Sequence, residues 1–282
     1  MKRFFTPAFC LSALLLIASC DKPLGERGCT DPNSFNYNPA AEQSDGSCQE
    51  MAGCLGYAPG FSNSGSTGNT LYNQQWDIKF GQEIQIQQNF FRGVPAQVSI
   101  LYEPSVQNKN AYANNQGQIL FGYHMFYYTV QNYGELPVAG ILAHEFGHRA
   151  QFTAGWQDYN KPFYRELEAD AFSGFYMALA KQYAWSQIQS YYANVYAAGD
   201  YNFNSPTHHG THQQRLQCAY LGVQTAVQAM QSGTQYTYQQ LHDLFNNAIR
   251  TQIDRRQAPL PTADVAYPAL NTAQRAALYP HF

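Results

Sequence analysis

Hydrophobic and polar positions alternate with strand spacing in the first half of the chain. Val98, Ile100 and Tyr102 alternate with other residues, which predicts a strand over 96–102. The apolar run between Gly117 and Gly122 is also typical of a strand. The stretch 81–91 fits either a strand or a short helix, because its spacing does not separate the two. Residues 53–75 are rich in Gly, Ser and Asn, and we expect them to form mostly loop.

Helical spacing dominates from about residue 124 onward. Pro162 suits the first turn of a helix, and Gly155 is a plausible stop for the helix before it. Asp200 to Pro206 reads as a loop between two helices. The pattern therefore predicts an α+β, mainly α-helical domain over 53–282 with a small sheet. Its helices are expected near 124–132, 135–153, 162–183, 184–198, 211–231, 237–253 and 271–278.

Composition supports a folded core and gives no sign of nucleic-acid binding. Of the 282 residues, 45% are hydrophobic and 15% aromatic, which is enough to build a sizeable core. Charged residues make up 12%, well below the usual quarter, so Gln, Asn, Ser and Tyr supply the polarity. The net charge of −3 offers no electrostatic attraction to a phosphate backbone.

The N-terminus resembles an export signal. Lys2 and Arg3 precede a mostly apolar run over 8–17, which is too short for a comfortable membrane span. The segment then ends in Ile17-Ala18-Ser19-Cys20, which resembles a bacterial lipobox. That resemblance implies a lipoprotein signal over 1–20, lipidation of Cys20, and anchoring in a membrane facing the periplasm or the cell surface. The alternative is an ordinary signal peptide that is cleaved nearby.

Export would place the remaining cysteines in an oxidising compartment. Residues 21–52 are rich in turn formers and form a Cys-bounded tether, either a disulfide-closed spacer or a module whose Asp and Asn oxygens bind calcium. Cys29, Cys48, Cys54 and Cys218 allow three pairings. We favour Cys29 with Cys48, and Cys54 with Cys218.

The strongest chemical signal is the His-Glu-x-x-His pattern at 144–148. His144 and His148 lie one helical turn apart on the same face, so two imidazoles can share one zinc ion. Glu145 lies one step round the helix, where it can take a proton from a water molecule at the metal. The alternative, a chance occurrence of three fixed residues, is disfavoured by the numbers of His and Glu in the chain.

A catalytic zinc site needs a third protein ligand, and the next predicted helix offers one. Glu166 and Asp170 are four residues apart and share a helix face. Glu166 can be the third ligand, and Asp170 can accept the outer ring N–H of His144 or His148. Glu168 should point away from this face. The alternative is that all three acids form a solvated helix surface.

These segments resemble the gluzincin metallopeptidases. The matching stretches are Leu142 to Gln151, Arg165 to Phe172, and Thr207 to Arg215, within about 110–225. They are most similar to a bacterial neutral zinc metallopeptidase family and, more distantly, to the CAAX prenyl protease and heat-shock membrane protease group. The transmembrane segments usual in the family are absent after the N-terminal signal. The resemblance implies a zincin-like fold with an active-site helix pair, and a zinc-dependent endopeptidase acting on peptide or protein substrates.

The resemblance also assigns two further features. His209 would donate to the oxyanion of the tetrahedral intermediate, although the extra His208 leaves the choice between 208, 209 and 212 open. The strand from Gly117 to Gly122 would be a sheet edge to which a peptide substrate adds, or an ordinary capped edge. The alternative to an enzyme is a non-catalytic zinc-binding surface lipoprotein or a chaperone-like binding protein.

Overall fold

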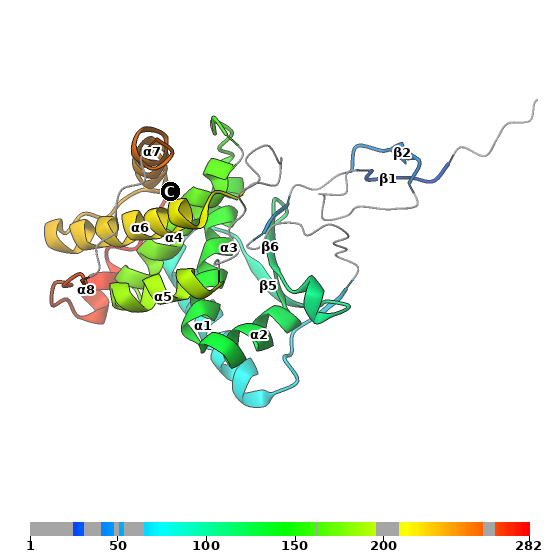
Figure 1. The fold of residues 1–282 in the computed structure, drawn as a ribbon, viewed down its shortest axis with the longest axis horizontal. Coiled ribbons are helices and arrows are strands. Elements are labelled where there is room, and N and C mark those ends of the chain that lie inside the picture. The colour runs from blue at the N-terminus through cyan, green and yellow to red at the C-terminus, as the bar shows by residue number, and fades with distance from the viewer. Residues whose placement is uncertain are drawn as a thin grey trace, which may run out of the picture.

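The computed structural model describes residues 25–30, 41–47, 51–53, 65–161, 163–195, 209–255 and 263–282 (Figure 1). Helices dominate and the sheets are small, which confirms the α+β, mainly α-helical class. The helices are α1 Gln74–Phe90, α2 Tyr123–Tyr133, α3 Leu136–Ala154, α4 Phe163–Leu179, α5 Trp185–Val195, α6 His212–Ser232, α7 Tyr238–Ala248 and α8 Thr272–Ala276, with a 3₁₀ turn at Val106–Asn108 and a π-helical turn at Ile249–Ile253. The strands are β1 Arg27–Gly28, β2 Gln43–Ser44, β3 Met51–Gly53, β4 Ser66–Gly68, β5 Gln97–Tyr102, β6 Ala111–Asn114 and β7 Gln118–Gly122.

Five strands form the main sheet, in the order β3-β6-β7-β5-β4. The prediction that the Gly117–Gly122 strand forms an edge is wrong, because β7 pairs with β6 on one side and β5 on the other. Local sequence patterns could not predict the parallel pairing of β5 with β7, because strand order depends on contacts between distant segments. The sheet also takes in the end of the predicted tether, because Met51 and Ala52 of β3 pair with Asn114 and Ala113 of β6.

The stretch that was ambiguous between strand and helix belongs to α1. Asn73 caps this helix, because its side chain accepts from the backbone N–H groups of Gln75 and Trp76. Phe80, Gln87 and Phe90 are its buried residues, and their spacing places them on one helix face. The helix therefore starts inside the stretch 53–75, which was expected to be mostly loop.

Helix α3 lies between the sheet and the other helices (Figure 1). It packs against β6 and β7 on one side and against α4 on the other, and its residues from Pro137 to Gln151 are all buried. It ends as expected at Gly155, whose φ of 71° is the left-handed conformation that glycine adopts readily. Arg149 fixes the helix to the sheet by donating from Nε to the Pro95 carbonyl at 2.9 Å and from Nη1 to the Asn114 carbonyl.

Helices α4 and α6 approach so closely that their backbones touch. A Cβ atom built on Gly222 would lie 2.0 Å from the Ala171 carbonyl oxygen and 2.6 Å from the Phe175 nitrogen. Both of these atoms belong to the backbone of α4, so no change of side-chain rotamer can relieve the clash. Gly222 therefore sets the distance between the helix that carries Glu166 and the helix that follows His209.

Replacing Gly222 with Ala should destabilise the fold by about 1–3 kcal/mol, because the added methyl must push the two helices apart. The matched control is Gly81→Ala in α1, where an added Cβ meets nothing within 4 Å. That change should stabilise the fold by about 0.5–1 kcal/mol through helix propensity alone. Urea unfolding measures both, and equal midpoints for the two variants would contradict the close approach of α4 and α6.

The predicted pairing of Cys54 with Cys218 is wrong, since Cys218 is a free thiol buried in α6. Burial raises its pKa well above the usual range, as expected of a thiol surrounded by apolar side chains. Cys29 is disulfide-bonded, and its partner lies outside the described residues. The predicted signal over 1–20 with its lipidation site Cys20, and the cysteines Cys48 and Cys54, also lie outside them.

Across the described ranges, none of the helices combines the length and the apolar character that a membrane span requires.

Candidate metal centre

Two adjacent helices bring together the three side chains expected to bind metal. His144 and His148 lie one turn apart on α3, and Glu166 lies in the first turn of α4. The Nε2 atoms of the two histidines are 3.0 Å apart, with the rings nearly perpendicular at 89°. The Glu166 carboxylate reaches both, at 3.4 Å from His144 Nε2 and 3.4 Å from His148 Nε2. The three side chains are buried, and they form a group that could hold a metal ion.

The spacing of the donor atoms fits a small tetrahedral ion. Ligand atoms about 2.05 Å from a tetrahedral zinc lie about 3.3 Å from one another. The two Nε2 atoms are 3.0 Å apart, and each lies 3.4 Å from a different oxygen of the Glu166 carboxylate. Glu166 Oε2 is buried and makes no hydrogen bond within the described part of the chain. This oxygen lies 3.0 Å from His209 Nδ1 and 3.4 Å from His144 Nε2, and a buried carboxylate is stabilised by a positive partner, which a metal ion bound to the histidines would supply.

Asp170 lies where the four-residue spacing from Glu166 places it, and its partner is His144. His144 Nδ1 lies 2.9 Å from Asp170 Oδ1, so Nδ1 donates and Nε2 is the ring atom that faces Glu166. Arg215 from α6 donates to both oxygens of Asp170, from Nε at 2.7 Å and from Nη2 at 2.9 Å. The hydroxyl of Tyr192 in α5 donates to the same carboxylate at 3.3 Å. Side chains from three other helices, α4, α5 and α6, therefore hold the His144 ring.

The charges of the centre depend on one another. Burial disfavours charge on His144, but Asp170 outweighs it and raises the pKa of His144 to about 9. Burial dominates at His148 and lowers its pKa. The pKa of Glu166 lies well below its usual range, because His148 and His209 together outweigh the cost of burial. The centre therefore favours an ionised Glu166, which is the form that ligates a metal.

Glu145 is fully buried and lies next to the ligands on α3. Neither of its carboxylate oxygens makes a hydrogen bond of normal geometry within the described residues. Burial raises the pKa of this carboxyl group to about 8, with a smaller opposing effect from His144. A buried carboxyl that is kept without partners, beside metal ligands, has the environment of a general base or acid.

His209 lies at the same centre. Its Nδ1 atom is 3.0 Å from Glu166 Oε2, and 12% of its side chain is exposed. It precedes α6, where Thr211 forms a capping box with Gln214. His208 lies outside the described residues, and His212 is the first residue of α6. Among the described residues, His209 therefore lies beside the candidate ligand Glu166.

The sequence reasoning gave no role to two side chains that contact the centre. Gln151 lies three residues after His148 on the same helix, and its Oε1 atom is 2.9 Å from His148 Nδ1. That spacing on one helix face could have indicated the contact. Arg215 belongs to a segment that resembles the peptidase family, but its bond to Asp170 spans 45 residues and has no local signal. Glu168 is not part of the group that could hold a metal ion, and all three acids are buried, so the alternative of a solvated acidic surface is wrong.

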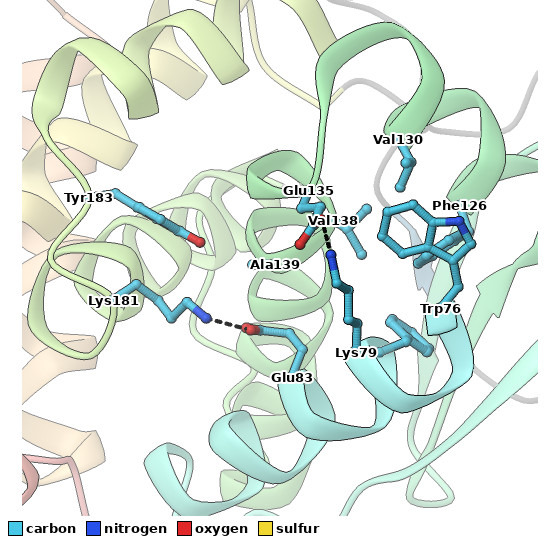
Figure 2. A pocket seen from close by; sticks show the side chains of 11 residues that line it. Trp76, Lys79, Glu83, Phe126, Val130, Glu135, Val138, Ala139, Lys181 and Tyr183 are labelled. Atoms are coloured by element: carbon cyan, nitrogen blue, oxygen red, sulfur yellow. Dashed lines mark hydrogen bonds and ion pairs between the residues drawn. The ribbon is translucent and has the colours of Figure 1, made fainter. Parts of the chain in front are cut away.

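A separate pocket lies between α1, α2 and α3 (Figure 2). It measures ≈ 80 Å³, and Trp76 and Phe126 contribute to its aromatic wall. Two ion pairs border it, Lys181 with Glu83 at 2.7 Å and Lys79 with Glu135 at 2.5 Å, and Figure 2 draws both as dashed lines. None of the predicted site residues lines this pocket. The charged side chains at this pocket pair with one another, and the pocket is separate from the metal centre.

Comparison with protein-family models, with curated proteins and with solved structures found no match for this chain.

Proposed function

We propose that the chain is a zinc-dependent endopeptidase with a zincin-like arrangement of its active-site helices. One observation carries the proposal: Glu145 is buried, makes no hydrogen bond of normal geometry to the described residues, and stands on the same helix as two of the three side chains that could hold a metal ion. A metal site that only supports the fold has no use for an unpaired carboxyl beside it, because burying that group costs free energy. The resemblance of the segments around the motif to gluzincin peptidases points in the same direction.

Zinc is the metal that suits this donor set. Two imidazoles and one carboxylate form a usual set of protein ligands for catalytic zinc. Calcium and magnesium prefer sets made of oxygen ligands, and no cysteine stands among these three side chains to favour a softer site.

The chain's own residues have distinct tasks in peptide hydrolysis. Bound zinc would supply the Lewis acid that polarises the scissile carbonyl and lowers the pKa of water. Glu145 takes the proton of the attacking water molecule and delivers it to the leaving amine. His209 stands beside Glu166, where its ring can donate to the charge that develops on the carbonyl oxygen. Asp170 holds His144 in the tautomer that leaves Nε2 free.

The substrate and the location follow from the same proposal. Peptide or protein chains are the substrate class, and the basic and apolar start of the sequence supports export and lipid anchoring at Cys20. The periplasm or the cell surface is then the place of action. The edges of the described sheet are β3 and β4, so a peptide that adds to this sheet as a strand would pair with one of them.

A non-catalytic zinc-binding surface protein is the second candidate. The low exposure of the centre favours it, since His144 and His148 are fully buried and the Glu166 side chain is 9% exposed. Structural zinc sites are closed in this way. Zinc bound without turnover of any unfolded protein would select this candidate over the peptidase.

The purified full chain should contain one zinc per molecule and cleave members of a mixed peptide library. Removal of the metal by a chelator should abolish cleavage, because the carbonyl then loses its polarising cation, and added zinc should restore it. Elemental analysis and mass spectrometry of the products give the two readouts. A zinc-free chain that cleaves at the same rate as the zinc-loaded chain would overturn the proposal.

A further inference from the structure

The side-chain amide of Gln151 is held in one orientation. Its Nε2 donates to Glu168 Oε2 at 2.8 Å and to the Arg165 carbonyl at 2.8 Å. Its Oε1 therefore faces His148, with the His148 Nδ1 atom 2.9 Å away. Both protons of the amide have acceptors, so an amide turned through 180° would place its oxygen against a carboxylate and a carbonyl.

This orientation sets the tautomer of a metal ligand. Because Gln151 Oε1 can only accept, His148 Nδ1 must carry the proton and donate. The lone pair of His148 is then on Nε2, the atom that faces Glu166 and His144. An amide nitrogen at this place would reverse the tautomer and put a proton on the ligating atom.

Glu168 is the group that holds the amide. It is fully buried, and three side chains donate to it: Gln151, the hydroxyl of Tyr159, and His242, whose Nδ1 lies 2.7 Å from Oε1. Three donors around two oxygens are typical of an ionised carboxylate, which can only accept hydrogen bonds. Such a charge in the interior needs a cation close by.

His242 supplies that cation. Its Nε2 lies 3.1 Å from Asp158 Oδ1, so the ring stands between two carboxylates and donates to both. These carboxylates outweigh the effect of burial and raise the pKa of His242, which favours the imidazolium. The Trp156 ring stacks on it at 4.1 Å. Asp158 is 64% exposed, so the chain of contacts runs from the metal ligand to the surface.

We propose that Glu168 and His242 are positioning residues for the metal centre: they lock the Gln151 amide and, through it, hold His148 in the tautomer that binds metal. The inference rests on the proposed function in one respect, because it takes His148 as a metal ligand. The proposal adds a chain of side-chain contacts that runs from α7 through α4 to α3, and its members are not metal ligands.

The molecule contains a matched control. Glu83 also accepts from a glutamine, a tyrosine and a cation, namely Gln87 Nε2 at 2.9 Å, Tyr176 OH at 2.5 Å and Lys181 Nζ at 2.7 Å. Its network borders the pocket of Figure 2 and includes none of the ligands. The change Glu83→Gln therefore reproduces the chemistry of Glu168→Gln without a connection to His148.

The first measurement is zinc affinity, by competition with a chromophoric chelator on the full chain. In Glu168→Gln the residue at 168 can donate as well as accept, so the Gln151 amide keeps only the Arg165 carbonyl as a partner that must accept, and its turned orientation becomes less costly. The dissociation constant for zinc should rise about 10- to 100-fold, while Glu83→Gln leaves it unchanged. His242→Gln, which keeps a donor and loses the charge, should weaken zinc binding in the same direction and serves if Glu168→Gln does not fold.

The second measurement is the ¹⁵N spectrum of the imidazoles in the metal-free chain. It should show His148 protonated on Nδ1 in the parent, and protonated in part on Nε2 in Glu168→Gln. An unchanged tautomer, or an equal loss of zinc affinity in Glu168→Gln and Glu83→Gln, would overturn the inference. If the parent chain binds no zinc, the proposed function is wrong. The tautomer of His148 in the parent and in Glu168→Gln then still tests this inference.

Discussion

Glu145→Gln should keep the zinc and lose about 100- to 10,000-fold in kcat, the usual contribution of a general base. Glutamine has nearly the shape of glutamate but cannot take a proton from water at neutral pH. Because neither oxygen of Glu145 is tied to the described part of the fold by a normal hydrogen bond, the change removes no support from the structure. Burial raises the pKa of Glu145 to about 8, so both the carboxyl and the amide are mostly uncharged at pH 7, and the free energy of unfolding should stay level.

Two measurements test this prediction. Zinc content by elemental analysis should match the parent, since His144, His148 and Glu166 are untouched. Cleavage of a fluorescent peptide should fall, whereas Glu83→Gln, a remote carboxyl change, should leave it at the parental rate. Cleavage by Glu145→Gln at the parental rate would remove Glu145 from the mechanism, and loss of zinc would show that the carboxyl supports the metal instead.

The parts of the centre that follow from local spacing could be predicted from the sequence. The four-residue steps from His144 to His148 and from Glu166 to Asp170 each lie on one helix, and the helix geometry alone brings their side chains to one face. The end of α3 at Gly155 was predictable for the same reason, because glycine reaches the left-handed conformation at little cost. Local rules held where the two partners belong to one element.

Contacts between distant segments could not be predicted in this way. The family resemblance implied that β7 is an edge, and nothing in its own residues shows that β5 and β6 flank it. His242 lies 74 residues from Glu168, and the helical pattern of α7 accounts for its burial without indicating its partner. The free thiol of Cys218 follows from its place inside the packed helices, whereas counting cysteines suggested a disulfide. These features depend on tertiary packing, which produces no periodic pattern of residues in the sequence.

Asp170→Ala should lower the free energy of unfolding by about 3–5 kcal/mol, the usual cost of leaving one partner of a buried ion pair alone. Arg215 is 4% exposed in its side chain, and both of its bonds described above go to Asp170. Arg215 and His144 hold the pKa of Asp170 below its usual range despite burial. The stabilisation from this carboxylate is therefore present above its unfolded pKa of about 3.9 and is lost as the pH falls through the lower folded value.

A double variant separates the two tasks of Asp170. Asp170→Leu combined with Arg215→Met replaces the buried pair with apolar side chains and should recover most of the stability lost by Asp170→Ala. Zinc affinity should not recover, because His144 Nδ1 still lacks the acceptor that fixes its tautomer. Urea unfolding of the metal-free chain and chelator competition measure the two effects. If zinc affinity returns together with stability, Asp170 serves the fold alone and the His144 ring needs no acceptor to bind metal.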